Sequence, residues 1–131
     1  MSDKTLESAA HSFFDDYMAS NADVEIICLA TSDGFPAVIK SQSSMNFDID
    51  TLAAAASTLY SVSNAVAKQI LAKRFRVTFI ESEQGNVAFV ALEVGSRDYV
   101  LAMSAKESMN IAQLRLLINR LAKEIAVSCA A

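Results

Sequence analysis

Three short segments of this chain are too apolar to form strands with a face in water. Residues 87–92 and 99–103 are apolar throughout and residues 24–30 nearly so, whereas a half-exposed strand alternates apolar and polar residues. A strand that is hydrophobic on both faces needs cover on both sides of its sheet. The sequence therefore requires a sheet between two covering layers.

Two further segments have the composition of edge strands. Segment 35–40 contains Pro36, which cannot donate a ladder hydrogen bond, and segment 75–81 carries charged residues. In the latter we expect Phe75, Val77 and Phe79 to share one face. Both segments are therefore predicted to lie at the two edges of the sheet.

Only one strand order places all three apolar strands inside the sheet. An Asp33-Gly34 turn, with positive φ expected at both residues, joins the first two strands, and two further turns join the last three. Numbered along the chain, the order is 2-1-5-4-3, and hairpin connections make it antiparallel. We expect a single domain over residues 1–131.

Three amphipathic segments complete an α+β fold with the element order α-β-β-α-β-β-β-α. Helices are predicted over residues 4–18, 49–72 and 108–127, with Asp48 or Asn46 capping the second. The long helix is expected on one face of the sheet and the two terminal helices on the other. The apolar stripes of the terminal helices are Leu6, Ala10, Phe13, Phe14 and Tyr17, and Ile111, Leu114, Ile118, Leu121 and Ile125.

The long helix has more apolar surface than one sheet can cover. Its apolar arc approaches about 180°, against roughly 100° for an ordinary surface helix. Small residues along it permit close approach of a second helix, although alanine is also simply a good helix former. The centre of the predicted buried arc consists of Leu52, Ala56, Leu59, Ser63, Val66 and Ile70.

This surplus predicts a homodimer. The edge strand 75–81 follows the long helix directly, and an exposed edge either carries guards such as Arg76 and Glu81 or pairs with the same edge of a second subunit. Which flank of the helix meets its partner stays open. The predicted interface residues are Ala53, Ala55, Ala56, Leu59, Tyr60, Val62, Val66, Phe75, Val77 and Phe79.

Composition excludes several classes of function. The chain carries 11 basic and 15 acidic residues, and its net charge of −4 disfavours nucleic-acid binding. Its three glycines, Gly34, Gly85 and Gly95, are too far apart for a phosphate-binding loop. One histidine and two cysteines cannot supply a zinc finger. We therefore expect neither metal nor cofactor.

The groups that could suggest chemistry have simpler explanations. A hydrolase would need a Gly-x-Ser-x-Gly turn, which is missing around the polar residues of the first helix, and carboxylates near 48–50 complement a helix start. A basic cluster marks the end of the long helix, although an acidic partner or phosphate there stays an alternative. These residues are His11, Ser12, Asp15 and Asp16, then Asp48 and Asp50, and finally Lys68, Lys73, Arg74 and Arg76. No catalytic residue is assigned, and we do not expect an enzyme.

The sequence predicts a cytoplasmic protein without membrane insertion. The first twenty residues are too charged for a signal peptide, and the uncharged stretch 51–67 contains too many polar residues for a membrane span. Cys28 and Cys129 are interpreted as free thiols in a reducing compartment, with a bridge between them left open.

Three stretches together resemble the Roadblock/dynein light chain family of small regulatory domains. They are the strand and turn at 27–36 (ICLATSDGFP), the alanine-rich helix with the strand and the 81–86 turn after it, and the run 110–116 (NIAQLRL). The last run is similar to the family pattern Asn-Leu-Gly-x-x-Arg, with Ala112 where glycine is usual. The resemblance covers nearly the whole chain and rests on the order and spacing of the stretches.

The resemblance implies a function as well as a fold. Members of the family typically dimerise through the long helix and the neighbouring edge strand into a ten-stranded sheet, and they act as non-catalytic adaptors or regulators of Ras-like GTPases. A relative in bacterial gliding motility works as a GTPase-activating partner. The pattern does not assign an arginine finger, although Arg74, Arg97 and Arg120 are exposed by position. The alternative is a small-molecule sensor of profilin-like architecture, which would need a central cavity with converging polar groups.

Overall fold

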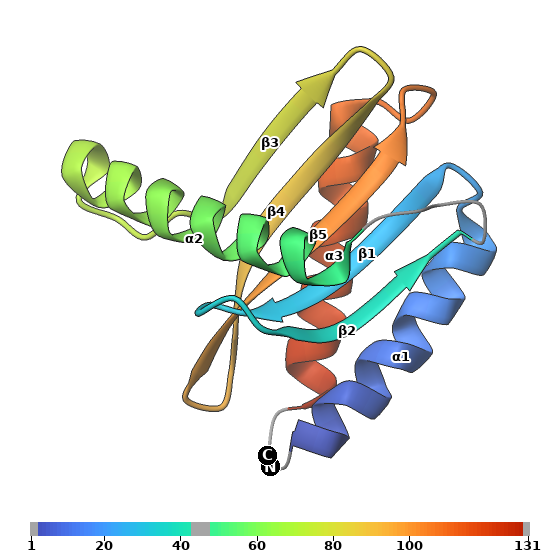
Figure 1. Cartoon of the computed structure of the whole chain (residues 1–131), viewed down its shortest axis with the longest axis horizontal. Coiled ribbons are helices and arrows are strands. Elements are labelled where there is room, and N and C mark those ends of the chain that lie inside the picture. The colour runs from blue at the N-terminus through green and yellow to red at the C-terminus, as the bar shows by residue number, and fades with distance from the viewer. Residues whose placement is uncertain (1–2, 43–47, 130–131) are drawn as a thin grey trace.

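The computed structural model describes residues 3–42 and 48–129, in which three helices enclose one sheet (Figure 1). The sheet is antiparallel, with the order β2-β1-β5-β4-β3, as the two-sided apolar strands require. Helix α2 lies on one face, and α1 and α3 lie on the other (Figure 1). The elements are α1 (Asp3–Ser20), β1 (Val24–Thr31), β2 (Pro36–Ser41), α2 (Ile49–Leu71), β3 (Val77–Ser82), β4 (Gly85–Val94), β5 (Arg97–Lys106) and α3 (Ile111–Ser128).

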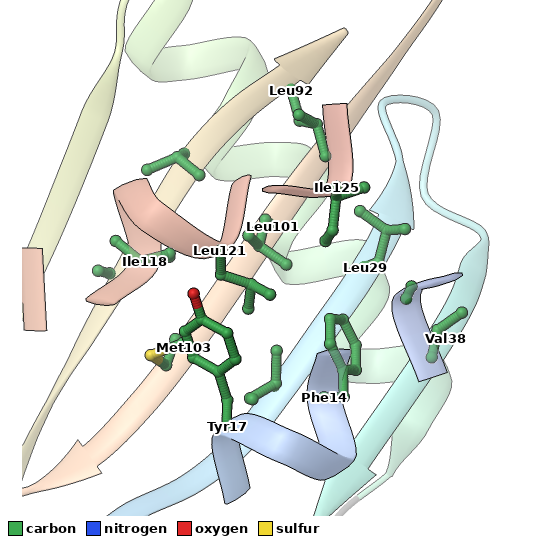
Figure 2. Close-up of a cluster of buried hydrophobic side chains, with 14 of the residues drawn as sticks. Phe14, Tyr17, Leu29, Val38, Leu92, Leu101, Met103, Ile118, Leu121 and Ile125 are labelled. Carbon is green, nitrogen blue, oxygen red and sulfur yellow. The ribbon is translucent and has the colours of Figure 1, made fainter. Parts of the chain in front are cut away.

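The larger of the two hydrophobic clusters lies between the sheet and helices α1 and α3. Figure 2 shows Phe14 and Tyr17 of α1 beside Leu121 of α3, with side chains of the central strands beneath them. Tyr17 donates a hydrogen bond to Glu124 Oε1 (3.0 Å) and accepts one from Arg120 Nε (3.1 Å), so its polar end is satisfied at the rim. The expected stripes of both terminal helices are confirmed, with Phe13 and Ile111 only half-buried.

The second cluster is smaller and lies between the sheet and the first half of α2. Ala53 and Ala56 are fully buried there against Cys28, Phe89 and Val100 of the central strands. Their small side chains let the helix backbone approach the sheet closely. Cover on both faces is what the doubly apolar strands β1, β4 and β5 require.

Local signals set the ends of α2 where the sequence indicated. Asp48 Oδ1 accepts hydrogen bonds from the backbone N–H groups of Asp50 (2.9 Å) and Thr51 (3.2 Å), so Asp48 is the N-cap. Asn46, the other cap considered, lies outside the described residues. At the other end, Ala72 adopts the left-handed conformation (φ 57°, ψ 32°), which stops the helix.

The turn between β1 and β2 differs from the expected one. Among the described residues around it, only Gly34 has positive φ (103°), whereas positive φ was expected at Asp33 as well. The Gly34 N–H donates to the Thr31 carbonyl (3.1 Å), and the Thr31 N–H donates to that of Phe35 (2.8 Å). The loop is therefore one residue longer than a two-residue turn, and only the residue after its central pair needs a left-handed backbone.

The start of β3 also corrects the sequence prediction. The strand begins at Val77, and Phe75 does not share a face with Val77 and Phe79. The Phe75 ring instead packs edge-to-face on Tyr60 of α2, with ring centroids 5.6 Å apart. Alternation of side chains holds only within a regular strand, and the backbone before Val77 is still leaving the helix end at Ala72.

Candidate interaction surface

The second half of α2 carries an unusual amount of exposed apolar surface. Val62 is 54% exposed, Val66 50%, Ile70 74% and Leu71 67%, whereas Ala53 and Ala56 in the first half are fully buried. Figure 1 shows the reason: the C-terminal half of α2 extends past β3, where the sheet ends. The centre of the predicted buried arc is therefore buried only in the first half, and the surplus that the sequence indicated is real.

A slot of about 780 Å³ runs along the free edge of β3. We define this β3 slot by its lining residues, which come from α2, β3, the segment between them and α3. The second half of α2 (residues 59–71) forms one wall of the slot, and the edge of β3 forms its floor. Arg115 of α3 lines the slot from the other face of the sheet. The lining residues are Leu59, Val62, Ser63, Val66, Ala67, Leu71, Arg74, Phe75, Arg76, Val77, Thr78, Phe79 and Arg115.

Only every second residue of β3 directs its backbone N–H and C=O groups toward β4. The two-residue turn after Ser82 pairs this residue with Gly85, and the Arg76 carbonyl accepts from Ala91 N–H (3.4 Å). Because alternate residues of a strand point their backbone groups to opposite sides, the even-numbered residues from 76 to 82 face β4. Val77, Phe79 and Glu81 therefore present their N–H and C=O groups to the slot.

Side-chain contacts hold the walls of the slot in place. The hydroxyl groups of Ser63 and Thr78 are 2.7 Å apart, which ties α2 to β3. The Arg74 guanidinium reaches Glu93 Oε2 and Asp98 Oδ1, both at 3.4 Å, and the hydrogen bond to Glu93 is the main cause of its raised pKa. These exposed pairs contribute little energy, but they hold the segment after α2 against the β4–β5 hairpin.

The ten residues predicted to form a dimer interface fall into four groups. Ala53 and Ala56 are covered by their own sheet and have no surface left for a partner, because the helix lies closest to the sheet at these positions. Tyr60 is half-buried, and Phe75 retains only 8% exposure. Ala55 is exposed outside the slot. Five residues line the slot together with Phe75: Leu59, Val62, Val66, Val77 and Phe79.

The predicted interface omits several residues of this surface, among them Leu71, Ile80 and Arg115. Leu71, which is 67% exposed, and Ile80, which is 42% exposed on the α2 side of β3, are both missing from the predicted interface. Arg115 lies in α3, and nothing in the sequence placed it near β3. Leu71 and Ile80 could have been found by asking where the sheet ends under the helix, whereas Arg115 needed the tertiary structure.

The other polar candidates are scattered over the surface. His11, Ser12 and Asp16 are exposed on α1, and Asp15 forms an ion pair with Lys40 (3.0 Å). Within residues 3–42 and 48–129, no three His, Cys, Asp or Glu side chains are grouped as metal ligands. No helix in these same ranges has the length and hydropathy of a membrane span.

The two cysteines are free thiols in separate clusters. Cys28 lies in the cluster beneath α2, and Cys129 lies in the cluster beneath α1 and α3. Burial raises the pKa of Cys28 to about 12 and raises that of Cys129 as well. Both thiols are therefore poor nucleophiles, because the thiolate is the reactive form.

Comparison with known proteins identifies the fold. The model of the Roadblock/LC7 domain family matches residues 14–105. Among solved structures, Myxococcus xanthus MglB has a TM-score of 0.75 at 20% identity, over 95% of this chain and 87% of that one. The gliding protein MglB from Thermus thermophilus has a TM-score of 0.78 at 17% identity, over 95% and 90%.

Two further structures extend this comparison. A Roadblock/LC7 domain from Streptomyces avermitilis has a TM-score of 0.60 at 20% identity, over 82% of this chain and 80% of that one. A structure described as MglB with a tetrameric arrangement has a TM-score of 0.78 at 18% identity, over 95% and 90%. No curated protein sequence matches the chain. At these identities the structures establish the fold alone.

Proposed function

The chain belongs to the Roadblock/LC7 domain family, and on this premise we propose that it is a non-catalytic homodimeric adaptor that binds and regulates a small Ras-like GTPase. The observation that carries the homodimer is the unpartnered α2 overhang beside the open β3 edge. The family resemblance carries the GTPase.

Self-association is supported by the kind of surface that α2 exposes. Val62, Val66 and Leu71 line the slot together with Val77 and Phe79 of β3, and a patch of exposed apolar residues is typical of a protein interface. In a dimer with two-fold symmetry the same surface of both copies meets, so each copy covers the exposed apolar residues of the other. The tetrameric arrangement in the description of one MglB structure fits a fold that associates with itself.

Regulation is proposed to occur without a catalytic group from this chain. Arg74 is held by Glu93 and Asp98, and Arg120 contacts the hydroxyl group of Tyr17 and lies over its ring, 5.3 Å from the centroid. An arginine finger has to leave such contacts and insert into the GTPase site. The chain would instead stimulate hydrolysis by ordering the switch loops of the GTPase itself.

The sensor alternative receives no support from the polar groups of the core. Among the described residues, no buried side-chain nitrogen or oxygen lacks a hydrogen-bond partner. A ligand pocket needs a few converging polar groups that the ligand satisfies. A thermal-shift screen against nucleotides and common metabolites tests this reading, and we expect no stabilisation.

The proposed function is tested in two stages. Multi-angle light scattering should give a dimer at micromolar concentration. Beads carrying the protein, exposed to source-cell lysate with either GDP or a non-hydrolysable GTP analogue, should then capture a Ras-like GTPase in one nucleotide state, and beads carrying an unrelated acidic domain should not.

A kinetic measurement completes the test. Single-turnover GTP hydrolysis by the captured GTPase is measured after purification, with and without this chain. We expect a changed rate of hydrolysis or a changed rate of nucleotide release. A monomer in solution, or capture that yields no GTPase in either state, contradicts the proposed function.

A further inference from the structure

The backbone of β3 limits how a second copy can pair with it. Only Val77, Phe79 and Glu81 direct their N–H and C=O groups away from β4. When two identical strands pair antiparallel about a two-fold axis, the residue numbers of every opposing pair have the same sum. Hydrogen bonds between the two strands form only where outward-facing residues oppose one another. The outward-facing residues all have odd numbers, so this sum must be even. The two-fold axis (the dyad) therefore lies level with one residue of each strand and not level with the midpoint between two residues.

One of these registers uses every outward-facing residue. With Phe79 on the dyad, Phe79 opposes Phe79 of the second copy, and Val77 opposes Glu81, so all three take part in hydrogen-bonded pairs. With Thr78 on the dyad, Glu81 falls opposite residue 75, which precedes the strand. With Ile80 on the dyad, Val77 falls opposite residue 83 in the turn. With Glu81 on the dyad, two carboxylates face each other.

Side chains on the α3 side of the sheet also fit the Phe79 register. Val77 and Phe79 are half-buried there, packed at the edge of the larger cluster. Two Phe79 rings on neighbouring strands would form a cross-strand aromatic pair. Glu81 of the second copy would enter the side of the slot that Arg115 lines, and opposite charges would then meet.

On the α2 side of the sheet, the same two-fold axis would place the exposed C-terminal half of α2 of each copy over Ile80 of the other. Ile80 faces this side, because it pairs with Val87 and Val87 packs in the cluster beneath α2, yet it is 42% exposed. The C-terminal half of α2 extends past β3 (Figure 1), so a two-fold axis at Phe79, perpendicular to the sheet, would place it over the β3 edge of the second copy. The exposed Val62 and Val66 of one copy and Ile80 of the other are then buried together.

The geometry points to a homodimer whose β3 strands pair antiparallel with Phe79 on the two-fold axis. The inference rests on the proposed function, because it assumes that a second copy of this chain occupies the β3 slot. It adds the register, and with it the pairs of residues that meet: Phe79 with Phe79, Val77 with Glu81, and Thr78 with Ile80.

Disulfide trapping distinguishes the registers. Thr78 and Ile80 lie between the outward-facing residues, so in the Phe79 register they form a non-hydrogen-bonded pair with Cα atoms about 4.5 Å apart, within disulfide reach. Thr78 and its own copy are then diagonal neighbours at about 7–8 Å, beyond that reach, and the same holds for Ile80. Single variants Thr78→Cys and Ile80→Cys, one of them tagged, are mixed and oxidised with diamide.

We expect a disulfide-linked heterodimer from the mixture and little linked homodimer from either variant alone. Ser82→Cys mixed with Thr78→Cys is the matched control, because these residues oppose each other only in the Ile80 register. The unmodified chain, with Cys28 and Cys129 buried, should not link at all.

Each other outcome overturns the register. Linking of Ile80→Cys with itself, or of the control mixture, places Ile80 on the dyad, and linking of Thr78→Cys with itself places Thr78 there. If no variant links while light scattering still gives a dimer for each, the strands do not pair and the proposed function survives. If light scattering of the unmodified chain gives a monomer, the proposed function itself fails.

Discussion

Replacing Val66 with alanine should weaken the homodimer without weakening the fold. Val66 lines the β3 slot and is 50% exposed in the single chain, so half of its side chain is left for a partner to cover. Removing two carbon atoms costs about 1.6 kcal/mol when they are fully buried, and thus roughly 0.8 kcal/mol for the half that dimerisation buries. The two-fold axis doubles this loss to about 1.6 kcal/mol, which raises the dissociation constant about 15-fold.

Val127→Ala is the matched control. Val127 is also a helical valine and is 71% exposed, but it lies on α3, away from the slot. Alanine is a better helix former than valine, which largely offsets the loss of the half of the Val66 side chain that its own chain buries, so neither substitution should greatly destabilise the single chain. Val127→Ala should leave the dissociation constant unchanged.

Sedimentation equilibrium over a range of concentrations gives the dissociation constants, and circular dichroism verifies the fold of each variant. The reasoning is refuted if Val66→Ala dimerises as tightly as the unmodified chain. It is refuted equally if Val127→Ala weakens the dimer by the same factor, because the interface would then not be specific to the α2 overhang.

Two predictions concern the fold itself. Ala72→Gly should raise the unfolding free energy in urea by about 0.5–1 kcal/mol, because the left-handed backbone (φ 57°) costs alanine more than glycine loses in chain entropy; a decrease would contradict this. Burial raises the pKa of Cys28 from 9.0 to about 12, so between these two pH values only the thiol of the unfolded chain ionises. The stability that Cys28 contributes below pH 9.0 is therefore lost as the pH rises. From about pH 8 to about pH 10, the unmodified chain should lose about 1.4 kcal/mol more than Cys28→Ala, and equal losses would show that Cys28 is not the cause.

The strand order could be read from the sequence because it depends on burial alone. Strands β1, β4 and β5 are apolar on both faces and therefore had to be internal, which left Pro36 and the charged residues of β3 at the edges. The cap of α2 is equally local, since Asp48 bonds to backbone groups only two or three residues away. The start of α3 was predicted three residues too early, at residue 108, because the capping role of Asn110, which bonds to Gln113, was not recognised.

The turn and the start of β3 depended on details that residue types do not specify. Asp-Gly is compatible with turns of different lengths, and hydrogen bonds of Thr31 to Gly34 and Phe35 selected the longer loop. The side on which Phe75 lies was decided by the path of the chain after Ala72 and by the contact with Tyr60.

The periodicity of α2 determined which side of the helix is apolar, but not how much of it the chain covers. An angle around the helix axis contains no information about where the sheet beneath the helix ends. The sheet ends at β3 (Figure 1), so Ala53 and Ala56 in the first half of α2 are buried while Val62 and Val66 in its second half are exposed. Arg115 reaches the same slot only because α3 packs on the opposite face. The sequence therefore determined that α2 carries more apolar surface than its own chain covers, and the width of the sheet decided where that surface lies.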